Sequence, residues 1–377
     1  MHILILNSEY PPIGGGAGNA SAHIARELVK LGHQVSVLTA AYRGLPREQE
    51  QDGVRIIRLP GLRRSAHRSD ALEQLLFMLV ATIWGFACVL KLRPDVSLAF
   101  FGAPSGVAAW AWSHLRRLPY IVCLRGGDVP GFRPYDFGWM HRLLGPLLHL
   151  VWRRAAAVVA NSRGLKELAK QFDDAASIQV IPNGVELATF EVAQRQWTPA
   201  RMLFVGRLVY QKGLDVLLEA LAGLTNAEWK LRLVGDGPQR AWLEKRAQEL
   251  GLRARIELGG WLGRGELPAA YGAANLFVYP SRHEGMPNAL LEAMASGLPA
   301  VATRIAGNEE LVVEGETGRL VAVEQAEELR AALADLLEDE ALRQRMGAAG
   351  RRRVEREYGW GRVAEGYLAL LEAALES

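Results

Sequence analysis

Cysteine is scarce in this sequence. Only two of its 377 residues are cysteines, and each of them, Cys88 and Cys123, stands in an apolar run. Buried free thiols in a reducing compartment therefore fit better than a disulfide or a metal site. The N-terminus also lacks the positively charged region that begins a secretion signal, because an apolar stretch follows Met1 almost directly. Together these absences predict a cytoplasmic protein.

A convincing membrane span is missing as well. The segment from Gln74 to Leu90 carries no charged residue, yet its 17 residues, bounded by Glu73 and Lys91, are at the short end for a spanning helix. We therefore expect a helix packed in a large α/β domain. A helix lying in the interface of a bilayer is the alternative.

The sequence lacks two signatures of cofactor binding. A dinucleotide-binding fold needs an acidic residue near the end of its second strand to hold a ribose, and here that strand ends in Thr39-Ala40-Ala41. This absence argues against NAD. An Asp-x-Asp metal motif is absent too. We expect no cofactor and no required metal.

Acidic charge is depleted in the first half of the chain. Residues 1–195 hold 22 Lys and Arg against 15 Asp and Glu, whereas the remainder holds 22 against 26. A solvated face is the simpler interpretation of the basic excess. A patch that meets anionic lipid head groups or a phosphate-bearing acceptor is the alternative. The arginines gathered in one short stretch are Arg43, Arg47, Arg55, Arg58, Arg63, Arg64 and Arg68.

The length and the order of the apolar segments predict two domains. A chain of 377 residues is about twice what one hydrophobic core organises. Apolar, β-branched runs alternate with segments of helical spacing, which predicts parallel sheets covered by helices on both faces. We expect an N-terminal Rossmann-like domain of residues 1–195, completed by a returning helix at 357–377. A C-terminal Rossmann-like domain of residues 196–356 follows the polar stretch near residue 195.

The expected elements alternate along both halves. Helices are expected at Ala20–Leu31, 71–92, Ala108–Arg116, Asp215–Leu224 and, as a pair interrupted at 358–360, from Ala326 to the end. Ligands bind at the carboxyl ends of the strands in such sheets, so the chemistry is expected in the loops there, in a cleft between the two facing domains. The expected strands are His2–Leu6, Gln34–Thr39, Val54–Leu59, Val96–Phe101, Tyr120–Leu124, Ala157–Ala160, 178–183, Met202–Val205, Trp229–Val234, Ile256–Leu258, Leu276–Tyr279 and Pro299–Ala302.

A glycine-rich turn, Gly14-Gly15-Gly16, joins the first strand to the first helix. Glycines let backbone N–H groups approach an anion closely, and a helix N-terminus favours negative charge. The turn alone is weak evidence, because any tight strand-to-helix connection favours glycine.

Two cations flank the turn after the first strand of the second half, in the string VGRLVYQKG. Arg207 and Lys212 are expected to point into the cleft. A diphosphate leaving group needs such fixed cations, because negative charge builds on it as the glycosidic bond breaks. The alternative is a pair of surface cations near a helix start, where they would oppose the helix dipole.

The segment from Pro280 to Thr303, PSRHEGMPNALLEAMASGLPAVAT, is the most informative part of the chain. Pro287 fits the first turn of a helix, which places Glu284 in the loop before it. Asn288 and Glu292 would then share one face, with free N–H groups at 288–290 pointing to a ligand. Glu292 suits the paired hydroxyls of a ribose, because a carboxylate accepts two hydrogen bonds. The alternatives are an exposed helix residue for Glu292 and a cap for Glu284.

These strings together resemble the family 4 (group 1) glycosyltransferases of the GT-B fold over essentially the whole chain. The matching strings are PPIGGGAGNASAHIARELVKLGHQVSVLT, VIPNGVELATF, FVGRLVYQKGLDVLLEAL, LVGDGPQRAWLE, PSRHEGMPNALLEAMASGLPAVAT and GNEELV. The resemblance implies two Rossmann-like domains across a cleft and a metal-independent transfer that retains anomeric configuration by front-face attack. It also implies a nucleoside-diphosphate sugar as co-substrate.

The resemblance also assigns roles to residues. Glu284 and Glu292 match the family's Glu-x7-Glu pair, which contacts the donor sugar and the ribose respectively. Arg207 and Lys212 match the diphosphate-binding pair, so these two and Glu284 are the expected catalytic residues. The expected donor-binding set is Gly15, Gly16, Arg207, Lys212, Glu284, Gly285, Met286, Pro287, Asn288, Ala289, Leu290 and Glu292.

One position departs from the family pattern. Where many members carry a His-Gly-x-Asp motif, this chain has Arg125-Gly126-Gly127-Asp128. An arginine stays protonated and cannot act as the same proton acceptor. Arg125 and Asp128 are therefore expected either to contact the donor sugar or acceptor, or to pair with each other. Bracing of the loop by Arg125 is the alternative.

The acceptor is less defined than the donor. Because the first half is basic and carries the apolar segment 74–90, we expect a hexosyl transfer to a glycan or lipid-linked acceptor. A peripheral contact with an anionic membrane at the cytoplasmic face would accompany it. No nucleic-acid partner is expected, and the nucleotide base is left open between uridine and guanosine. A nucleotide-sugar epimerase or hydrolase on the same fold, or a non-catalytic sugar-nucleotide-binding protein, are the alternative functions.

Overall fold

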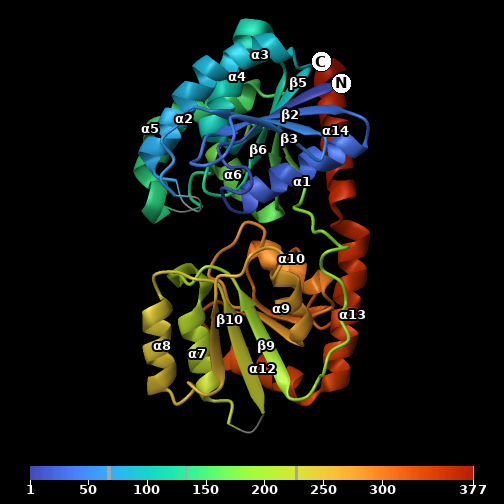
Figure 1. Ribbon diagram of the computed structural model, residues 1–377. Helices are drawn as coiled ribbons and strands as arrows, with labels where there is room; N and C mark the ends of the chain where they lie inside the picture. Colours follow the sequence, from blue (N-terminus) through green and yellow to red (C-terminus); the bar gives the residue numbers. More distant parts are fainter. Residues whose placement is uncertain (66–68, 133, 226–227, 377) are drawn as a thin grey trace. The chain divides into compact units, whose positions relative to one another are not determined.

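The computed structural model describes residues 1–65, 69–132, 134–225 and 228–376 (Figure 1). The chain divides into two compact units: unit 1 comprises Met1–Asn183 and Trp360–Ser377, and unit 2 comprises Gly184–Gly359. Each unit is an α/β layer structure in which helices cover both faces of a mainly parallel sheet. The expected fold class of two doubly wound domains is therefore confirmed for each unit by itself.

Unit 1 contains, in its described residues, an eight-stranded sheet of order β3-β4-β2-β1-β5-β6-β7-β8. All neighbouring strands pair in parallel except β3 and β4, which are antiparallel. The polar β3 edge strand was not expected, because it has no apolar face to bury. The strands are β1 His2–Leu6, β2 Gln34–Ala40, β3 Glu48–Gln51, β4 Val54–Leu59, β5 Val96–Phe100, β6 Tyr120–Leu124, β7 Ala157–Ala160 and β8 Ile178–Val180.

The helices of unit 1 lie in two layers. One layer is α1 (Gly16–Lys30) with α14 (Trp360–Glu376), which share a core with one face of the sheet. The other face packs against a second core to which α2 to α6 contribute. These helices are α2 Ala71–Val80, η1 Ala81–Gly85, α3 Phe86–Leu92, η2 Phe101–Ser105, α4 Gly106–Arg116, α5 Pro134–Arg154 and α6 Arg163–Phe172. Of the two free thiols, Cys123 is buried and Cys88 half-buried.

The apolar segment at 71–92 forms one continuous helix through α2, η1 and α3. Its buried stripe repeats every four residues, at Phe77, Ala81, Gly85 and Val89, because the π-helical turn η1 widens the helical repeat. The opposite face remains exposed, and only 22% of the most apolar window is buried. The expectation of a helix packed inside the domain is therefore correct for one stripe only. By length and composition alone this helix passes as a candidate membrane span.

Unit 2 contains, within the described residues, a six-stranded parallel sheet of order β11-β10-β9-β12-β13-β14. Its strands are β9 Ala200–Val205, β10 Trp229–Val234, β11 Ile256–Gly260, β12 Leu276–Tyr279, β13 Ala300–Thr303 and β14 Gly318–Val321. Its helices are η3 Tyr210–Lys212, α7 Leu214–Ala222, α8 Arg240–Glu249, α9 Leu267–Ala273, α10 Asn288–Ala295, α11 Ala306–Glu309, α12 Ala326–Glu338 and α13 Glu340–Glu357. One apolar core joins both faces of the sheet to the helices.

The first break between the units lies earlier than the expected boundary at 195/196. Residues 184–195 belong to unit 2, because Val185 and Phe190 are buried in its core and Arg195 donates to the carbonyls of Ala274 and Ser296. The second break falls at Gly359, inside the expected interruption. Tyr358 packs in the core of unit 2, whereas Trp360 packs in unit 1.

Candidate active site

The candidate site of unit 2 is built from two loops that follow neighbouring strands. Strands β9 and β12 pair in parallel, so the loop after Val205 and the loop after Tyr279 leave the same edge of the sheet. The loops touch at Gly213, whose φ of +62° and whose position leave no room for a side chain. A Cβ there would lie 2.1 Å from the carbonyl oxygen of Pro280. This glycine therefore allows Lys212 to approach the second loop.

Lys212 and Glu284 meet at this edge. The Lys212 ammonium donates to Glu284 Oε1 at 2.5 Å and to the Tyr279 hydroxyl at 2.6 Å. The Tyr279 hydroxyl in turn donates to the same Glu284 oxygen at 3.2 Å. Both charged side chains are about seven-eighths buried, with 13% and 12% of their surfaces exposed. Sequence motifs single out the lysine and the glutamate but not Tyr279, which has the pattern of the last apolar residue of a strand.

Tyr279 and Glu284 keep Lys212 charged. Burial by itself lowers the pKa of Lys212, but the carboxylate of Glu284 and the oxygen of Tyr279 raise the pKa above its usual range overall. Burial also raises the pKa of Tyr279, which keeps its hydroxyl protonated as a donor. A permanent cation is thus held against a carboxylate that neutralises it.

Arg207 lies in the same loop in a different environment. It follows Gly206 directly after β9 and is exposed, whereas Lys212 is largely buried. Gly206 is in close contact with Gly235, where a Cβ would lie 1.9 Å from the Gly206 carbonyl oxygen. The turn is therefore fixed by backbone packing, and Arg207 projects from a rigid support.

Helix α10 begins directly after Pro287, which was expected to lie in its first turn. Its first residue is Asn288, and Pro287 is the N-cap residue with extended backbone. The N–H of Leu290 donates to the Pro287 carbonyl at 3.1 Å, so it is not free for a ligand as expected. In the described residues, no side chain caps this helix. Gly285, Met286 and Pro287 are buried beneath its start, which makes them supports for the loop.

Glu292 lies one turn into α10 and is half-buried. Its Oε2 accepts a hydrogen bond from the Tyr271 hydroxyl at 2.8 Å. Burial raises the pKa of Glu292 to about 7, although the hydrogen bond from Tyr271 and the charge of Arg264 lower it. Near neutral pH this carboxyl group is therefore poised between its two protonation states. Tyr271, an unexpected partner, comes from α9.

An ion-pair cluster holds the second loop in place. Arg282 donates two hydrogen bonds to the carboxylate of Asp215, at 2.9 and 2.7 Å, and a third to Glu324. Its guanidinium also stacks 3.7 Å from the ring centroid of Tyr210. Arg282 thereby ties the loop before Glu284 to the start of α7. The bidentate pairing was not evident from the sequence, because 67 residues separate its partners.

In unit 1 the glycine turn has the expected geometry, with one addition. Gly14 has a φ of +97°, and a Cβ on it would lie 2.5 Å from the Cβ of Glu9. Gly15 caps α1 and Gly16 begins it. The N–H of Gly15 donates to Glu9 Oε2 at 3.1 Å. A carboxylate of the protein thus occupies one of the N–H groups that the glycine turn offers to an anion.

Arg125 braces its loop. Its guanidinium donates to Asn183 Oδ1 at 2.7 Å and to the Tyr367 hydroxyl at 2.9 Å, and it lies over the ring of Phe100. Asp128 instead accepts backbone N–H groups, including that of Arg125 at 2.9 Å. Burial raises the pKa of Asp128, although these N–H groups act in the opposite direction. The side-chain ion pair between Arg125 and Asp128 is therefore not formed, and the bracing alternative has direct support.

The basic stretch of unit 1 is not a uniform solvated face. Arg58 and Arg63 are buried, and Arg55 pairs with Glu48 at 2.5 Å. Arg43, Arg47 and Arg64 are exposed, and Arg68 lies outside the described residues. Arg58 and Arg63 therefore fit neither interpretation of this stretch, a solvated face or a patch for anionic groups, because their side chains are buried. Polar backbone groups satisfy the buried guanidinium groups in part, at the carbonyls of Pro46, Ser8 and Ser65.

Comparison with solved structures shows that the chain has the GT-B fold. Sucrose-phosphate synthase from Thermosynechococcus elongatus superposes with a TM-score of 0.85 at 23% identity, over 98% of each chain. The Anabaena protein Alr3699/HepE, solved in complex with UDP-glucose, has a TM-score of 0.79 at 20% identity, over 99% of this chain and 100% of that chain. At these identities the likeness shows the fold.

The family follows from sequence comparison. The model "Glycosyl transferase 4-like domain" matches residues 15–184, and "Glycosyl transferases group 1" matches residues 188–353. The protein named glycogen synthase of Mycobacterium tuberculosis is 31% identical over 97% of this chain and 92% of its own length. The chain belongs to the group 1, family 4 glycosyltransferases, and it is an enzyme.

Proposed function

We propose that this enzyme is a retaining glycosyltransferase that moves a hexosyl unit from a nucleoside-diphosphate sugar to a glycan or lipid-linked acceptor. The observation that carries the proposal is the pairing of Lys212 with Glu284 at the carboxyl edge of the unit 2 sheet. A cation there suits a diphosphate, and a carboxylate beside it suits sugar hydroxyls. The UDP-glucose complex of a protein with the same fold supports this donor class.

Each residue then has a role at the donor. Lys212 and Arg207 offset the negative charge that builds on the departing diphosphate, and Glu284 orients the sugar hydroxyls. The start of α10 faces the donor at Asn288 and Ala289, while the buried Gly285, Met286, Pro287 and Leu290 support it from beneath. Glu292 accepts hydrogen bonds from the ribose hydroxyls. Gly15 and Gly16 meet the phosphates when Glu9 releases the Gly15 N–H.

The reaction proceeds by front-face attack. The acceptor oxygen forms a bond to the anomeric carbon on the face from which the diphosphate leaves, while the bond between that carbon and the phosphate oxygen breaks. The proton of the acceptor hydroxyl passes to the departing phosphate. Retention of configuration follows without a covalent enzyme intermediate. Because Lys212 and Arg207 supply fixed positive charge, transfer requires no divalent ion.

A donor panel tests this function. Release of nucleoside diphosphate is measured for UDP- and GDP-linked hexoses with and without glycan acceptors, in the presence of EDTA, and the anomer of the product is assigned by NMR. Release that depends on acceptor is the expected result. Release without acceptor would favour a hydrolase or epimerase, and donor binding without release would favour a non-catalytic protein. Activity that survives both Glu284→Ala and Lys212→Ala would overturn the site.

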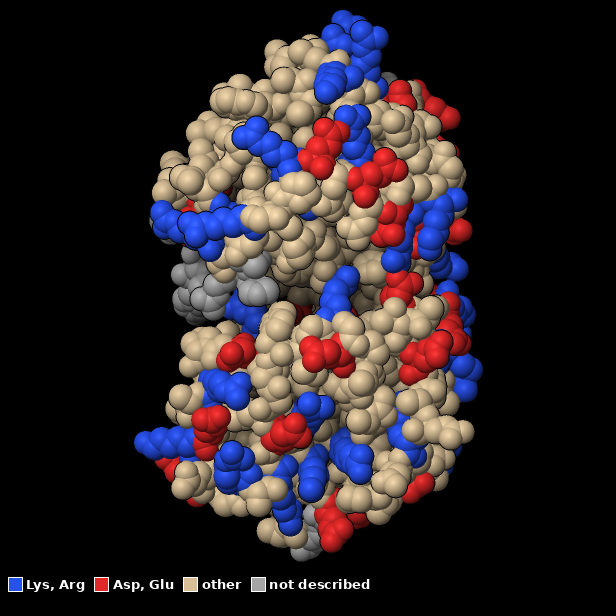
Figure 2. All heavy atoms as spheres, viewed as in Figure 1, with Lys and Arg blue, Asp and Glu red and all other residues tan. Residues whose placement is uncertain are grey.

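The exposed face of the α2–α3 helix supports a membrane-associated acceptor. Six large apolar side chains along it are between 40% and 64% exposed: Leu72, Leu75, Leu79, Ile83, Trp84 and Leu90. Single exposed apolar residues are ordinary, but a row of them along one helix marks an interaction surface. The upper left of Figure 2, where these helices lie, is mainly uncharged with Lys and Arg side chains standing out from it.

Basic residues gather at one end of this face. Because β5 and β6 are parallel neighbours, the segments that precede them lie side by side, with Ser97 N–H donating to the Pro119 carbonyl. Lys91 and Arg93 in one segment, and Arg116 and Arg117 in the other, are exposed, with Asp95 as the acidic residue among them. Apolar side chains beside a net positive cluster fit the surface of an anionic bilayer. This enzyme is proposed to work there, at the cytoplasmic face of the membrane.

A further inference from the structure

The loops that carry Lys212 and Glu284 come from different strands of the unit 2 sheet. We call residues 206–213, after β9, the lysine loop, and residues 280–287, after β12, the glutamate loop. The ion pair joins the loops through two side chains, and a lysine reaches its partner on a flexible four-carbon stem. The contacts between the backbones of the two loops therefore decide how closely the pair is matched.

Hydrogen bonds between the loops lie directly beside the two charged groups. The Arg282 N–H donates to the Gln211 carbonyl at 2.8 Å, and the Gln211 side-chain amide donates to the His283 carbonyl at 2.8 Å. The Arg282 guanidinium donates to the Tyr210 carbonyl at 2.6 Å. All of these residues are one or two positions from the lysine or the glutamate in the chain. Arg282 thus contributes to the connection through both its backbone and its side chain.

Arg282 is itself fixed by a carboxylate outside both loops. Its guanidinium donates to both oxygens of Asp215, at 2.9 and 2.7 Å, and Asp215 stands in the first turn of α7, two residues after the lysine loop ends. Burial alone raises the pKa of Asp215, but the hydrogen bonds and the charge of Arg282 lower the pKa overall, so the pair stays ionised. A bidentate pair of planar groups fixes direction as well as distance.

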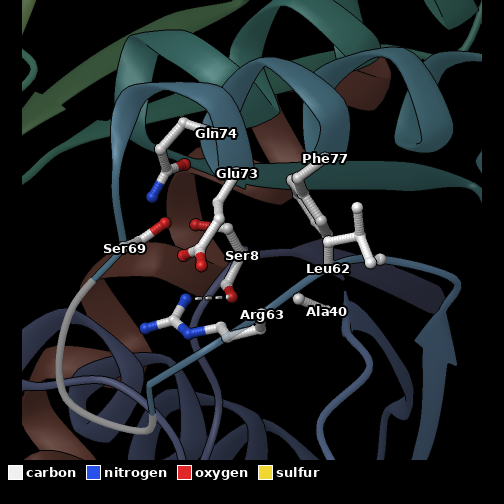
Figure 3. A pocket seen from close by; sticks show the side chains of 9 residues that line it. Ser8, Ala40, Leu62, Arg63, Ser69, Glu73, Gln74 and Phe77 are labelled. Carbon is white, nitrogen blue, oxygen red and sulfur yellow. Dashed lines mark hydrogen bonds between the residues drawn. The ribbon is translucent and has the colours of Figure 1, made fainter.

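A buried arginine of unit 1 provides a contrast (Figure 3). Arg63 donates to the carbonyls of Ser8 and Ser65 at 3.2 and 3.1 Å, and its Nη2 has no hydrogen-bond partner among the described residues. Ser8, Arg63 and Gln74 line a recess of about 10 Å³, the size of one water molecule that can pair with their polar atoms. Burial alone therefore does not make an arginine a clamp between segments. The bidentate pairing with Asp215 does.

We infer that Arg282 is a positioning residue for the transfer, which holds the glutamate loop against the lysine loop so that Glu284 stays on Lys212. Its bonds to Asp215 and to the Tyr210 carbonyl act through the backbones of the two loops. A diphosphate that binds Lys212 competes with Glu284, so the position of this carboxylate sets how much of the lysine's charge the diphosphate receives. The role of Arg282 in sugar transfer rests on the proposed function. Its hold on the ion pair does not.

A double-mutant cycle of nucleotide binding tests this role. Calorimetry measures the Kd of UDP or GDP, whichever the wild type binds more tightly, with and without Glu284→Gln. In the wild-type background this change should lower the Kd about three- to tenfold, because the diphosphate no longer shares the lysine. In the Arg282→Lys background, which keeps the charge and loses the bidentate geometry, it should alter the Kd less than about twofold, because the carboxylate is no longer held on the ammonium.

A second variant and a matched control accompany the cycle. Asp215→Asn breaks the same bidentate pair from its other side and should reduce the effect of Glu284→Gln in the same way. Arg153→Lys is the control, because Arg153 also pairs through two nitrogens with a buried carboxylate, that of Asp173 in unit 1. The full effect of Glu284→Gln should remain in that background. Thermal melting verifies that the variants are folded, and a role in general stability alone would lower the Tm without changing the effect.

An equal effect of Glu284→Gln in the wild-type, Arg282→Lys and Asp215→Asn backgrounds would overturn the positioning role. An unchanged Kd on Glu284→Gln in the wild-type background would also overturn it. Acceptor-dependent release of nucleoside diphosphate is measured in parallel, and Arg282→Lys should lower its kcat about tenfold, because the carboxylate that orients the sugar is displaced.

The two measurements separate this inference from the proposed function. Acceptor-dependent release by the wild type, with an equal effect of Glu284→Gln in every background, would leave the transfer standing and remove the positioning role. A reduced effect in the Arg282→Lys and Asp215→Asn backgrounds, with no release from any donor by the wild type, would support the hold of Arg282 on the ion pair and overturn the proposed function.

Discussion

Lys212 Nζ lies 2.5 Å from Glu284 Oε1, in a pair that is about seven-eighths buried. The cation proposed for the diphosphate is therefore already neutralised by the carboxylate proposed for the sugar. A bound diphosphate has to share Lys212 with Glu284. The two residues act as one unit, and the effect of changing either depends on the other.

Glu284→Gln should therefore change binding and transfer in opposite directions. Loss of the carboxylate leaves more positive charge for the diphosphate, so the Kd of UDP or GDP should fall about three- to tenfold, or roughly 0.6–1.4 kcal/mol. Sugar transfer should fall about a hundredfold, because the group that orients the donor is lost. Calorimetry measures the first quantity and diphosphate release the second. A higher Kd than that of the wild type would contradict the proposed competition between Glu284 and the diphosphate for Lys212.

Arg207→Gln should weaken diphosphate binding, with Arg201→Gln as its matched control. Both arginines are exposed in unit 2, but Arg201 stands at the amino end of β9 and Arg207 follows the carboxyl end. Loss of a charged contact to phosphate corresponds to about a tenfold rise in Kd. Arg201→Gln should leave the Kd as in the wild type. Equal effects of the two changes would show a long-range charge effect only.

Glu292→Gln should stabilise the protein at alkaline pH. Burial raises the pKa of Glu292 from 4.5 to about 7, so the folded state binds its proton more tightly than the unfolded state. The contribution of protonated Glu292 to the free energy of unfolding is fully present below about pH 4.5, and it declines as the pH rises towards 7. The neutral amide avoids this decline. Since the side chain is half-exposed, we expect a Tm gain of about 2–4 °C at pH 8, the effect of roughly 1 kcal/mol, and almost none at pH 4.

Differential scanning calorimetry over this pH range measures the effect of Glu292→Gln. The exposed Glu338→Gln on α12 is the control and should show no pH-dependent change. The same Glu292 variant should raise the donor KM, because the ribose loses a carboxylate. A constant Tm difference at every pH would show that the protonation of Glu292 is not coupled to folding.

Gly213→Ala should damage the donor site, while Gly251→Ala should cost little more than backbone strain. Both glycines have positive φ, +62° and +70°, but a Cβ at Gly213 would lie 2.1 Å from the Pro280 carbonyl oxygen, whereas Gly251 faces open space. We expect about 1 kcal/mol of destabilisation at Gly251 and several times that at Gly213. Denaturant unfolding measures both. Comparable losses would show that the two loops can separate freely.

Trp84→Ser should weaken binding to lipid vesicles, and Trp261→Ser should not. The two tryptophans are 56% and 61% exposed, but Trp84 lies in the apolar row of the α2–α3 helix and Trp261 in unit 2. Sedimentation with vesicles of anionic lipid at low and high salt should show wild-type binding that salt reduces. If the wild type does not sediment with the vesicles at either salt concentration, the enzyme reaches its acceptor from solution.

The local elements of this protein were largely predictable from sequence. Strands β1, β4 and β6 have the expected bounds, because apolar β-branched runs flanked by turn residues leave little choice. The polar β3 was missed, since only its pairing with β4 makes it a strand. Lys212, Glu284 and Glu292 were singled out from motifs, yet Tyr271 and Tyr279 were not, because buried tyrosines in apolar segments look like ordinary core residues.

Sequence alone thus determined the family, the two α/β halves and the residue types offered to a donor, because these depend on local periodicity and on short motifs. The tertiary structure decided which of those residues touch. The parallel pairing of β9 with β12 brings Lys212 to Glu284, and the order of β1, β2 and β4 brings Ser8, Arg63 and Gln74 around one recess. Burial, which sets the pKa of Glu292 and leaves polar atoms unpaired, arises only when segments distant in the chain exclude water together.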